Sequence, residues 1–404
     1  MFQLTSSEKK LFLFNLLIFF LNGLAFGVFM NSDVIARRVL GASTFTVTFM
    51  LFLTNGVLIT SLPMVSLMGR GRRRLKFLIR AAMVCSIPVM MLYFHESIAF
   101  FVFAVFLVYI LNTILPPALN LLFKRNYRRE VTGKLYGVAT SLRMIATMTG
   151  ALITGKLLDI SEAYHIPLFA AAGFMTMGSV IITAFLNYGE TEEEKADNSH
   201  VSIRQSLKNM NRIIAEDRVF YRFERNYIIY GLAFLLLLPV IPVYFVDALK
   251  LDYTTISTSR QVVGLAGLML LSPIAGYIFD RYNTFHFTGL MFLILTMYPL
   301  FLGISGFVPG DLKVYMVYAG YAIYSIAMTG IQISWNIGTI RLATLADSDI
   351  YQGIHITLTG LRSLFGPLLG FLLMKFFGYQ AAFATAFGLF LTAGILMLRE
   401  KEGS

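Results

Sequence analysis

The sequence predicts an all-α membrane protein with 12 transmembrane helices arranged as two pseudo-symmetric six-helix bundles. Of its 404 residues, 57% are hydrophobic. Only 14% are charged, against about 25% in an average soluble domain, which is too few to cover a water-soluble surface. The apolar residues also gather into long runs, each close to the roughly 20 residues that cross a bilayer as a helix.

Each run is expected to be a helix, because backbone polar groups inside hydrocarbon must be satisfied within their own segment. An outer-membrane barrel would instead show shorter segments of alternating polarity, which this sequence lacks. In chain order the predicted helices cover residues 11–30, 44–64, 76–94, 98–122, 135–158, 166–187, 226–247, 257–279, 287–306, 313–340, 353–377 and 380–398.

The runs divide into two halves, residues 1–187 and 226–404, joined by a charged linker at residues 188–225. The linker begins acidic and turns basic, and Ile203, Leu207, Met210 and Ile214 recur at helical spacing along it. That spacing predicts an amphipathic helix on the cytoplasmic membrane surface. A solvated tether with some helix is the alternative.

The two halves look like a degenerate duplication. Gly137 and Gly150 recur, at one common offset, as Gly353 and Gly366. Each match alone is weak, but both agree with the six-plus-six spacing of the runs. Internal repeats of this kind place a solute site at the repeat interface, near the middle of the bilayer.

The net charge is +11, and the distribution of the basic residues along the chain agrees with a membrane topology. If both termini are cytoplasmic, the great majority of Lys and Arg outside the spans lie on the cytoplasmic side, as the positive-inside rule requires. We therefore expect a multi-pass protein of the cytoplasmic (inner) membrane with both termini inside, and no nucleic-acid partner.

No motif predicts an enzyme, a cofactor or a metal site. Cys85 is the only cysteine, so neither an internal disulfide nor a cysteine metal cluster can form. The sequence has no zinc-protease, nucleophile-elbow or phosphate-loop motif, so we expect no catalytic residues and no ATPase. Any transport would have to be driven by a gradient.

Two loops carry a family resemblance. The segment Gly276-Tyr-Ile-Phe-Asp280-Arg281 matches the pattern Gly-x-x-x-Asp-Arg, and the equivalent loop of the first half keeps the basic cluster Arg70-Gly-Arg72-Arg73-Arg74 without the acid. With its twelve spans, the chain resembles the major facilitator superfamily of secondary transporters. The resemblance implies gating roles for Arg70, Arg73, Asp280 and Arg281. In the family the acid of this loop helps to close the cytoplasmic gate by pairing with a charge, and the first half lacks that acid.

The resemblance also implies a monomer in the lipid bilayer that moves a small-molecule substrate by alternating access, with a coupling proton or ion as a further partner. Because the family surrounds its cavity with spans 1, 4, 7 and 10, Asn22 in the first span and Asn112 in the fourth become candidate substrate-binding residues.

Two arginines within spans suggest the charge of the substrate. Arg143 and Arg362 lie deep in the fifth and eleventh predicted helices, whereas Asp and Glu fall only at span ends. A desolvated guanidinium needs a counter-charge, and a bound anion can supply it. The alternative is that each arginine ties helices together by reaching backbone carbonyls or loop acids.

The tenth predicted helix carries a polar and aromatic stripe in which Tyr321, Ser325, Met328, Gln332 and Trp335 recur at helical spacing, with Asn336 alongside. Aromatic rings with a few amides suit a solute pocket, so Gln332, Trp335 and Asn336 are candidate substrate-binding residues. Helix packing, with Gln332 hydrogen-bonded to a neighbouring span, is the alternative.

Together these features predict a secondary active transporter for a small organic solute, with an anionic solute preferred. A multidrug efflux antiporter stays open, although the expected lack of deep carboxylates counts against it. A non-transporting membrane sensor on a transporter scaffold also stays open, and a polytopic membrane enzyme is disfavoured by the lack of a catalytic cluster.

Overall fold

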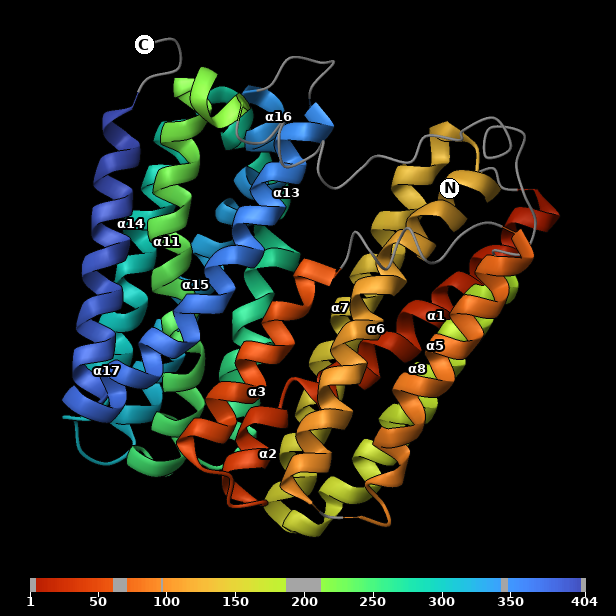
Figure 1. The fold of residues 1–404 in the computed structure, drawn as a ribbon, viewed down its shortest axis with the longest axis horizontal. Helices are drawn as coiled ribbons and strands as arrows, with labels where there is room; N and C mark the ends of the chain where they lie inside the picture. Colours follow the sequence, from red (N-terminus) through yellow and green to blue (C-terminus); the bar gives the residue numbers. More distant parts are fainter. Residues whose placement is uncertain (1–4, 61–70, 96, 187–211, 343–347, 401–404) are drawn as a thin grey trace. The chain divides into compact units, whose positions relative to one another are not determined.

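The computed structural model describes residues 5–60, 71–95, 97–186, 212–342 and 348–400, and every element in these ranges is helical (Figure 1). Helix is present in the described part of each of the twelve apolar runs, as predicted. Within the described part of the chain, 8 helical stretches are long and apolar enough to cross a membrane. The chain is therefore an integral multi-pass membrane protein in its architecture.

The chain divides into two compact units that each borrow a short segment from the other half of the sequence. Unit 1 consists of Met1–Ser43, Val57–Asn198 and Asp252–Val262, and unit 2 of Thr44–Gly56, Ser199–Leu251 and Val263–Ser404. The segments that pack together are thus not strictly the two sequence halves.

Unit 1 is built around its first helix, which packs along α7 and α8. Thr5 and Glu8 form a reciprocal capping box at its start. The described helices of unit 1 are α1 (Ser6–Phe29), α2 (Ser32–Arg38), η1 (Val57–Thr60), α5 (Gly71–Met91), α6 (Ile98–Asn126), α7 (Arg129–Ile160), η2 (Glu162–Tyr164), α8 (His165–Leu186), α12 (Tyr253–Ser257) and most of η4 (Thr258–Val263).

Unit 2 is built around α11, which lies side by side with the long α17 (Figure 1). Its described helices are α3 (Thr44–Gly56), α11 (Arg218–Val243), η3 (Tyr244–Ala248), α13 (Gly264–Arg281), α14 (Thr284–Ser305), α15 (Leu312–Ile333), η5 (Ser334–Gly338), α16 (Thr339–Leu342) and α17 (Ser348–Arg399). Gly378, with a φ of 84°, divides α17 into two helices, which correspond to the last two predicted spans.

Helix α11 begins earlier than its apolar run suggests. Asp217 caps it by accepting a hydrogen bond from the backbone N–H of Phe220, so residues 218–225 of the expected linker are helical. The cations of this segment make it resemble a solvated linker in the sequence. In the structure Arg222 and Arg225 pair with Glu400, and other residues of the same turns are buried. The rest of the linker, with its predicted amphipathic helix, falls largely outside the described residues.

Among the described residues, π-helical turns end α11 (η3), join α12 to α13 (η4) and join α15 to α16 (η5). Such turns are rare, shift the register of the side chains that follow, and occur often at functional sites. Here η4 carries Arg260 and Gln261, and η5 carries Trp335 and Asn336. The turn η5 therefore sets the direction of two of the predicted substrate-binding side chains.

Candidate functional site

In unit 1, the aromatic ring of Phe26 on α1 joins side chains from three helices. The guanidinium carbon of Arg143 on α7 lies 5.8 Å from the centre of this ring. The ring of Tyr109 on α6 lies 6.2 Å from it at a 54° tilt. All three residues are partly buried, so they form one face that lies between the packed core and the exposed surface.

Arg143 enters this face without an ion-pair partner among the described residues. Its guanidinium contacts the π-face of Phe26, and cation–π contacts offset part of the cost of burying a cation. An anion could supply the remaining counter-charge.

Of the two candidate asparagines in unit 1, Asn22 is the more deeply buried. It is only 3% exposed, and its Oδ1 atom has no hydrogen-bond partner among the described residues. The next residue, Gly23, lies against the backbone carbonyl of Arg143, so α1 and α7 meet at this level. Asn112 is partly buried and donates from Nδ2 to the carbonyl oxygen of Val108, 3.2 Å away on its own helix.

Arg362 lies in unit 2 and is held by protein groups. It is 8% exposed, and it donates from Nη1 to the backbone carbonyl of Tyr227 on α11 and from Nη2 to Thr359 Oγ1 at 3.0 Å. Its guanidinium also lies where a side chain at Gly231 would be, so that glycine makes room for it. This geometry matches the alternative in which the arginine ties two helices together.

A buried carboxylate and imidazole, those of Glu224 and His355, lie near Arg362. His355 is two turns before Arg362 on α17, and Glu224 is one turn before Tyr227 on α11. His355 Nδ1 on α17 is 2.8 Å from Oε1 and 3.0 Å from Oε2 of Glu224 on α11. The two side chains are 0% and 3% exposed, respectively. The ring of Trp335 on η5 packs edge-to-face against the imidazole, with the ring centres 5.2 Å apart, so an aromatic ring covers one side of the pair.

Two carboxylates are also buried in the protein, and both lie near the ends of their apolar stretches. Glu224 and Asp33 are 3% and 4% exposed and lie within stretches long and apolar enough to span a membrane. Glu224 was missed because it was assigned to the linker, although the spacing of Phe220, Phe223, Tyr227 and Tyr230 extends the buried face of α11 beyond it. That spacing is the signal that could have found it.

The predicted stripe on the tenth helix divides in two. Its first part is packed: Tyr321 and Ser325 are buried, and Ser325 Oγ accepts a hydrogen bond from the backbone N–H of Gly267 on α13 at 2.6 Å. Further along, Gln332 and Asn336 are exposed on the surface of unit 2. The π-helical turn η5 separates Trp335 from these two amides by directing it towards His355.

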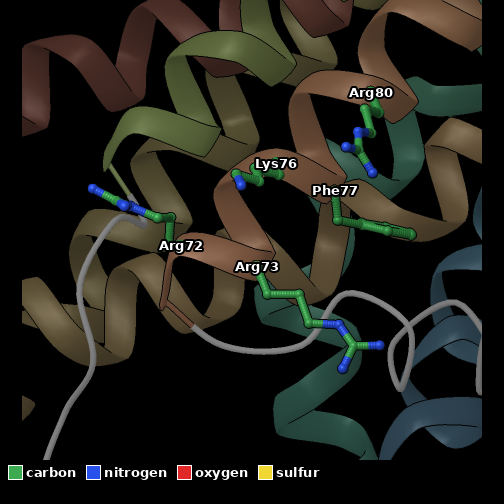
Figure 2. Close-up of a pocket in the computed structure, with 5 residues that line it drawn as sticks. All are labelled: Arg72, Arg73, Lys76, Phe77 and Arg80. Carbon is green, nitrogen blue, oxygen red and sulfur yellow. The ribbon is translucent and has the colours of Figure 1, made fainter.

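The predicted gating residues lie at helix ends. Arg70 falls outside the described residues, and Arg73 lines a pocket of about 480 Å³ at the start of α5 together with Arg72, Lys76, Phe77 and Arg80 (Figure 2). In unit 2, Asp280 and Arg281 are exposed at the end of α13. The guanidinium of Arg281 lies 4.0 Å from the centre of the Tyr277 ring.

One buried ion pair in unit 1 was not predicted. Asp33 at the start of α2 accepts two hydrogen bonds from Arg260 on η4, at 3.0 and 2.7 Å. Beside it, Ser257 Oγ donates to Asn31 Oδ1 at 2.9 Å. The partners are far apart in sequence, so no local spacing could have indicated this cluster.

The elements of the described residues are all helical, and their apolar stretches give the architecture of a multi-pass membrane protein. The model of the Major Facilitator Superfamily matches residues 12–348, and the chain belongs to this family. The family and its transporter relatives point to a secondary transporter and away from an enzyme. No curated protein matches the chain in sequence.

Solved structures of transporters share the fold at low sequence identity. The nucleoside transporter NupG is 12% identical with a TM-score of 0.69, and the match covers 98% of this chain and 100% of that one. A proton-dependent oligopeptide transporter is 11% identical with a TM-score of 0.70, covering 96% of each chain. The human organic anion transporter MFSD10 is 14% identical with a TM-score of 0.61, covering 97% and 100%.

Proposed function

We propose that this protein is a gradient-driven secondary transporter of a small organic anion that works by alternating access. The observation that carries the proposal is Arg143, a partly buried guanidinium that takes part in no ion pair within the described residues. A cation inside a membrane protein is costly, and such residues usually mark a solute or ion pathway. A carboxylate or phosphate on the solute would offset that cost through a charge-assisted, bidentate contact.

The groups around Arg143 support an organic solute over an inorganic ion. Phe26 and Tyr109 offer aromatic surface, and Asn22 and Asn112 offer amide groups on the same two helices. Apolar surface with a few placed polar groups is typical of small-molecule sites. In unit 2 we assign substrate contact to the exposed amides Gln332 and Asn336. We treat Trp335 as packed against His355, and Arg362 as a helix-linking residue.

The proposal includes the setting of the transporter. We propose that it is a monomer in the cytoplasmic membrane with both termini inside, as the distribution of Lys and Arg favours. One of the structural neighbours is an organic anion transporter, and another is a proton-dependent transporter. Each supports the corresponding part of the proposal only as a likeness of fold.

The experiment is counterflow in proteoliposomes that contain the purified full-length protein. Vesicles are loaded with one of a set of organic anions, cations or neutral solutes, and exchange with the same radiolabelled solute outside is measured. We expect exchange with at least one anion, and a loss of at least tenfold in the Arg143→Ala variant. The control is Lys156→Ala, which removes an exposed cation from the same helix and should leave exchange unchanged.

The other outcomes separate the alternatives. Exchange of cations alone would overturn the anionic assignment and favour a multidrug antiporter. A solute that raises the melting temperature of the protein without being exchanged would indicate a sensor. Equal anion exchange in the wild type and in Arg143→Ala would remove Arg143 from the site.

A further inference from the structure

The imidazole of His355 is the least explained polar group in unit 2. Its Nδ1 atom faces Glu224, but its Nε2 atom is buried and has no hydrogen-bond partner among the described residues. The residue is 0% exposed. A buried nitrogen without a partner costs free energy, so its retention requires a reason.

The contact with Glu224 determines which nitrogen can take up a proton. An ionised carboxylate only accepts hydrogen bonds, so Nδ1 carries the hydrogen and donates it to Glu224. The neutral ring then has its lone pair on Nε2. Uptake of one proton at Nε2 gives an imidazolium facing a carboxylate, and no other bond forms or breaks.

The charged groups around the pair determine the net charge of the cluster before and after the proton is bound. Among the described residues, the titratable or charged groups that face it are Glu224 and Tyr227 on α11 and Arg362 on α17, and Arg341 on α16 is directed to the carbonyl of Phe279. From the other packed elements, η5 contributes the uncharged Trp335, α3 contains no Asp, Glu, Lys, Arg or His, and the one histidine of α14, His286, is exposed. With a neutral imidazole, Glu224 and Arg362 cancel, and one added proton leaves the cluster with a single positive charge.

Two polar groups at the helix ends pair with each other. The hydroxyl of Tyr351, one turn before His355, donates to Asp217 Oδ2 at 2.7 Å. Asp217 lies at the N-terminus of α11, two turns before Glu224. Both helices therefore carry a protonatable group near their beginning, and the apolar side chains of Phe220 and Ile354 pack beside these groups.

We propose that Glu224 and His355 form a proton-binding site in unit 2, with Nε2 of His355 as the atom that takes up the proton. Binding of the proton itself is independent of the transported solute. The use of this proton as the coupling ion rests on the proposed function. The bound proton gives the cluster one positive charge, which is equal in size and opposite in sign to the charge of a monoanionic solute.

Trp335 provides a direct test that needs no substrate. It is the only tryptophan of the chain, and its ring lies 5.2 Å from the imidazole of His355. An imidazolium quenches indole fluorescence more strongly than a neutral imidazole, because it accepts an electron from the excited ring more readily. Tryptophan emission of the purified full-length protein in detergent is titrated between pH 5 and pH 9.

We expect emission to fall through a single transition as the pH is lowered, and His355→Gln to abolish that transition. Glu224→Gln should keep the transition but shift its midpoint, because the imidazolium loses the negative charge that faces it. His165→Gln, which replaces another buried histidine on α8, is the matched control and should leave the titration unchanged.

The wild-type titration tests the proposal even if a variant fails to fold. A flat titration of the wild type would overturn it, as would a transition that persists in folded His355→Gln protein. Glu224→Asp retains the charge, so a midpoint that moves as far in Glu224→Asp as in Glu224→Gln would also count against the carboxylate. The result does not depend on Arg143 or on any solute, so it can succeed where the anion assignment fails.

Discussion

Asp33 and Arg260 form a two-point ion pair inside unit 1, although 227 residues separate them in the chain. The two Nη atoms of Arg260 reach the two carboxylate oxygens of Asp33, and the side chains are 19% and 5% exposed. The π-helical turn η4 brings Arg260 to this position, and Gln261 in the same turn donates to the carbonyl of Met30 at 3.2 Å. The pair therefore fixes a segment of the second sequence half onto α1 and α2.

Loss of either partner should destabilise the protein strongly. Asp33→Asn leaves the guanidinium of Arg260 without its counter-charge, and breaking a buried ion pair costs about 3–5 kcal/mol. The melting temperature in detergent should fall by several degrees for Asp33→Asn and for Arg260→Gln, and the double variant should lose less than the sum of the two. Glu216→Gln is the control, because the ion pair of Glu216 with Arg212 is exposed. Strictly additive losses would show that the two residues do not act as a pair.

The close contact of α11 and α17 depends on Gly370. A Cβ atom there would overlap the backbone carbonyl of Leu236, which cannot move aside as a side-chain tip can. Gly370→Ala should therefore push the helices apart and cost about 1–3 kcal/mol, measured as a lower melting temperature. Gly388→Ala, in the second part of α17, meets no atom within 4 Å and should not lower it. Equal effects of the two substitutions would contradict the packing described for α11 and α17.

The positions of the helices could be predicted because the hydrophobic requirement of a bilayer is local and cumulative. Any 20-residue stretch either meets it or does not. Where an apolar face extends into charged sequence, as from Phe220 to Tyr230 on α11, average composition conceals the helix start. Glu224 lies in that concealed part, and the buried acid was therefore missed.

The candidate site could be predicted only in part, for a different reason. Arg143 was identified because a charge within an apolar run stands out in the sequence. Contacts such as Asp33 with Arg260, or His355 with Glu224, depend on helices that are distant in the chain and leave no periodic signal. The π-helical turn η5 likewise breaks the regular spacing that placed Trp335 and Gln332 on one stripe.

The two arginines within spans should differ in what their loss affects. Arg362 holds the backbone carbonyl of Tyr227, so Arg362→Ala should lower the melting temperature by several degrees. Arg143 makes no such contact within the described residues, so Arg143→Ala should change the melting temperature little while anion counterflow is lost. Lys156→Ala again serves as the control for a lost cation. If Arg143→Ala is the less stable variant, the assignment of roles must be reversed.

Proton coupling at Glu224 and His355 predicts a specific separation of two transport assays. Counterflow exchanges solute for solute and needs no net proton movement, whereas concentrative uptake driven by a pH gradient needs a proton to bind and be released in every cycle. In proteoliposomes with the anion found by counterflow, the wild type should accumulate it more strongly as the outside pH falls from 8 to 6. His355→Gln should retain counterflow but lose accumulation at every pH. His165→Gln should behave as the wild type, and accumulation by His355→Gln at the wild-type level would show that the coupling proton binds elsewhere.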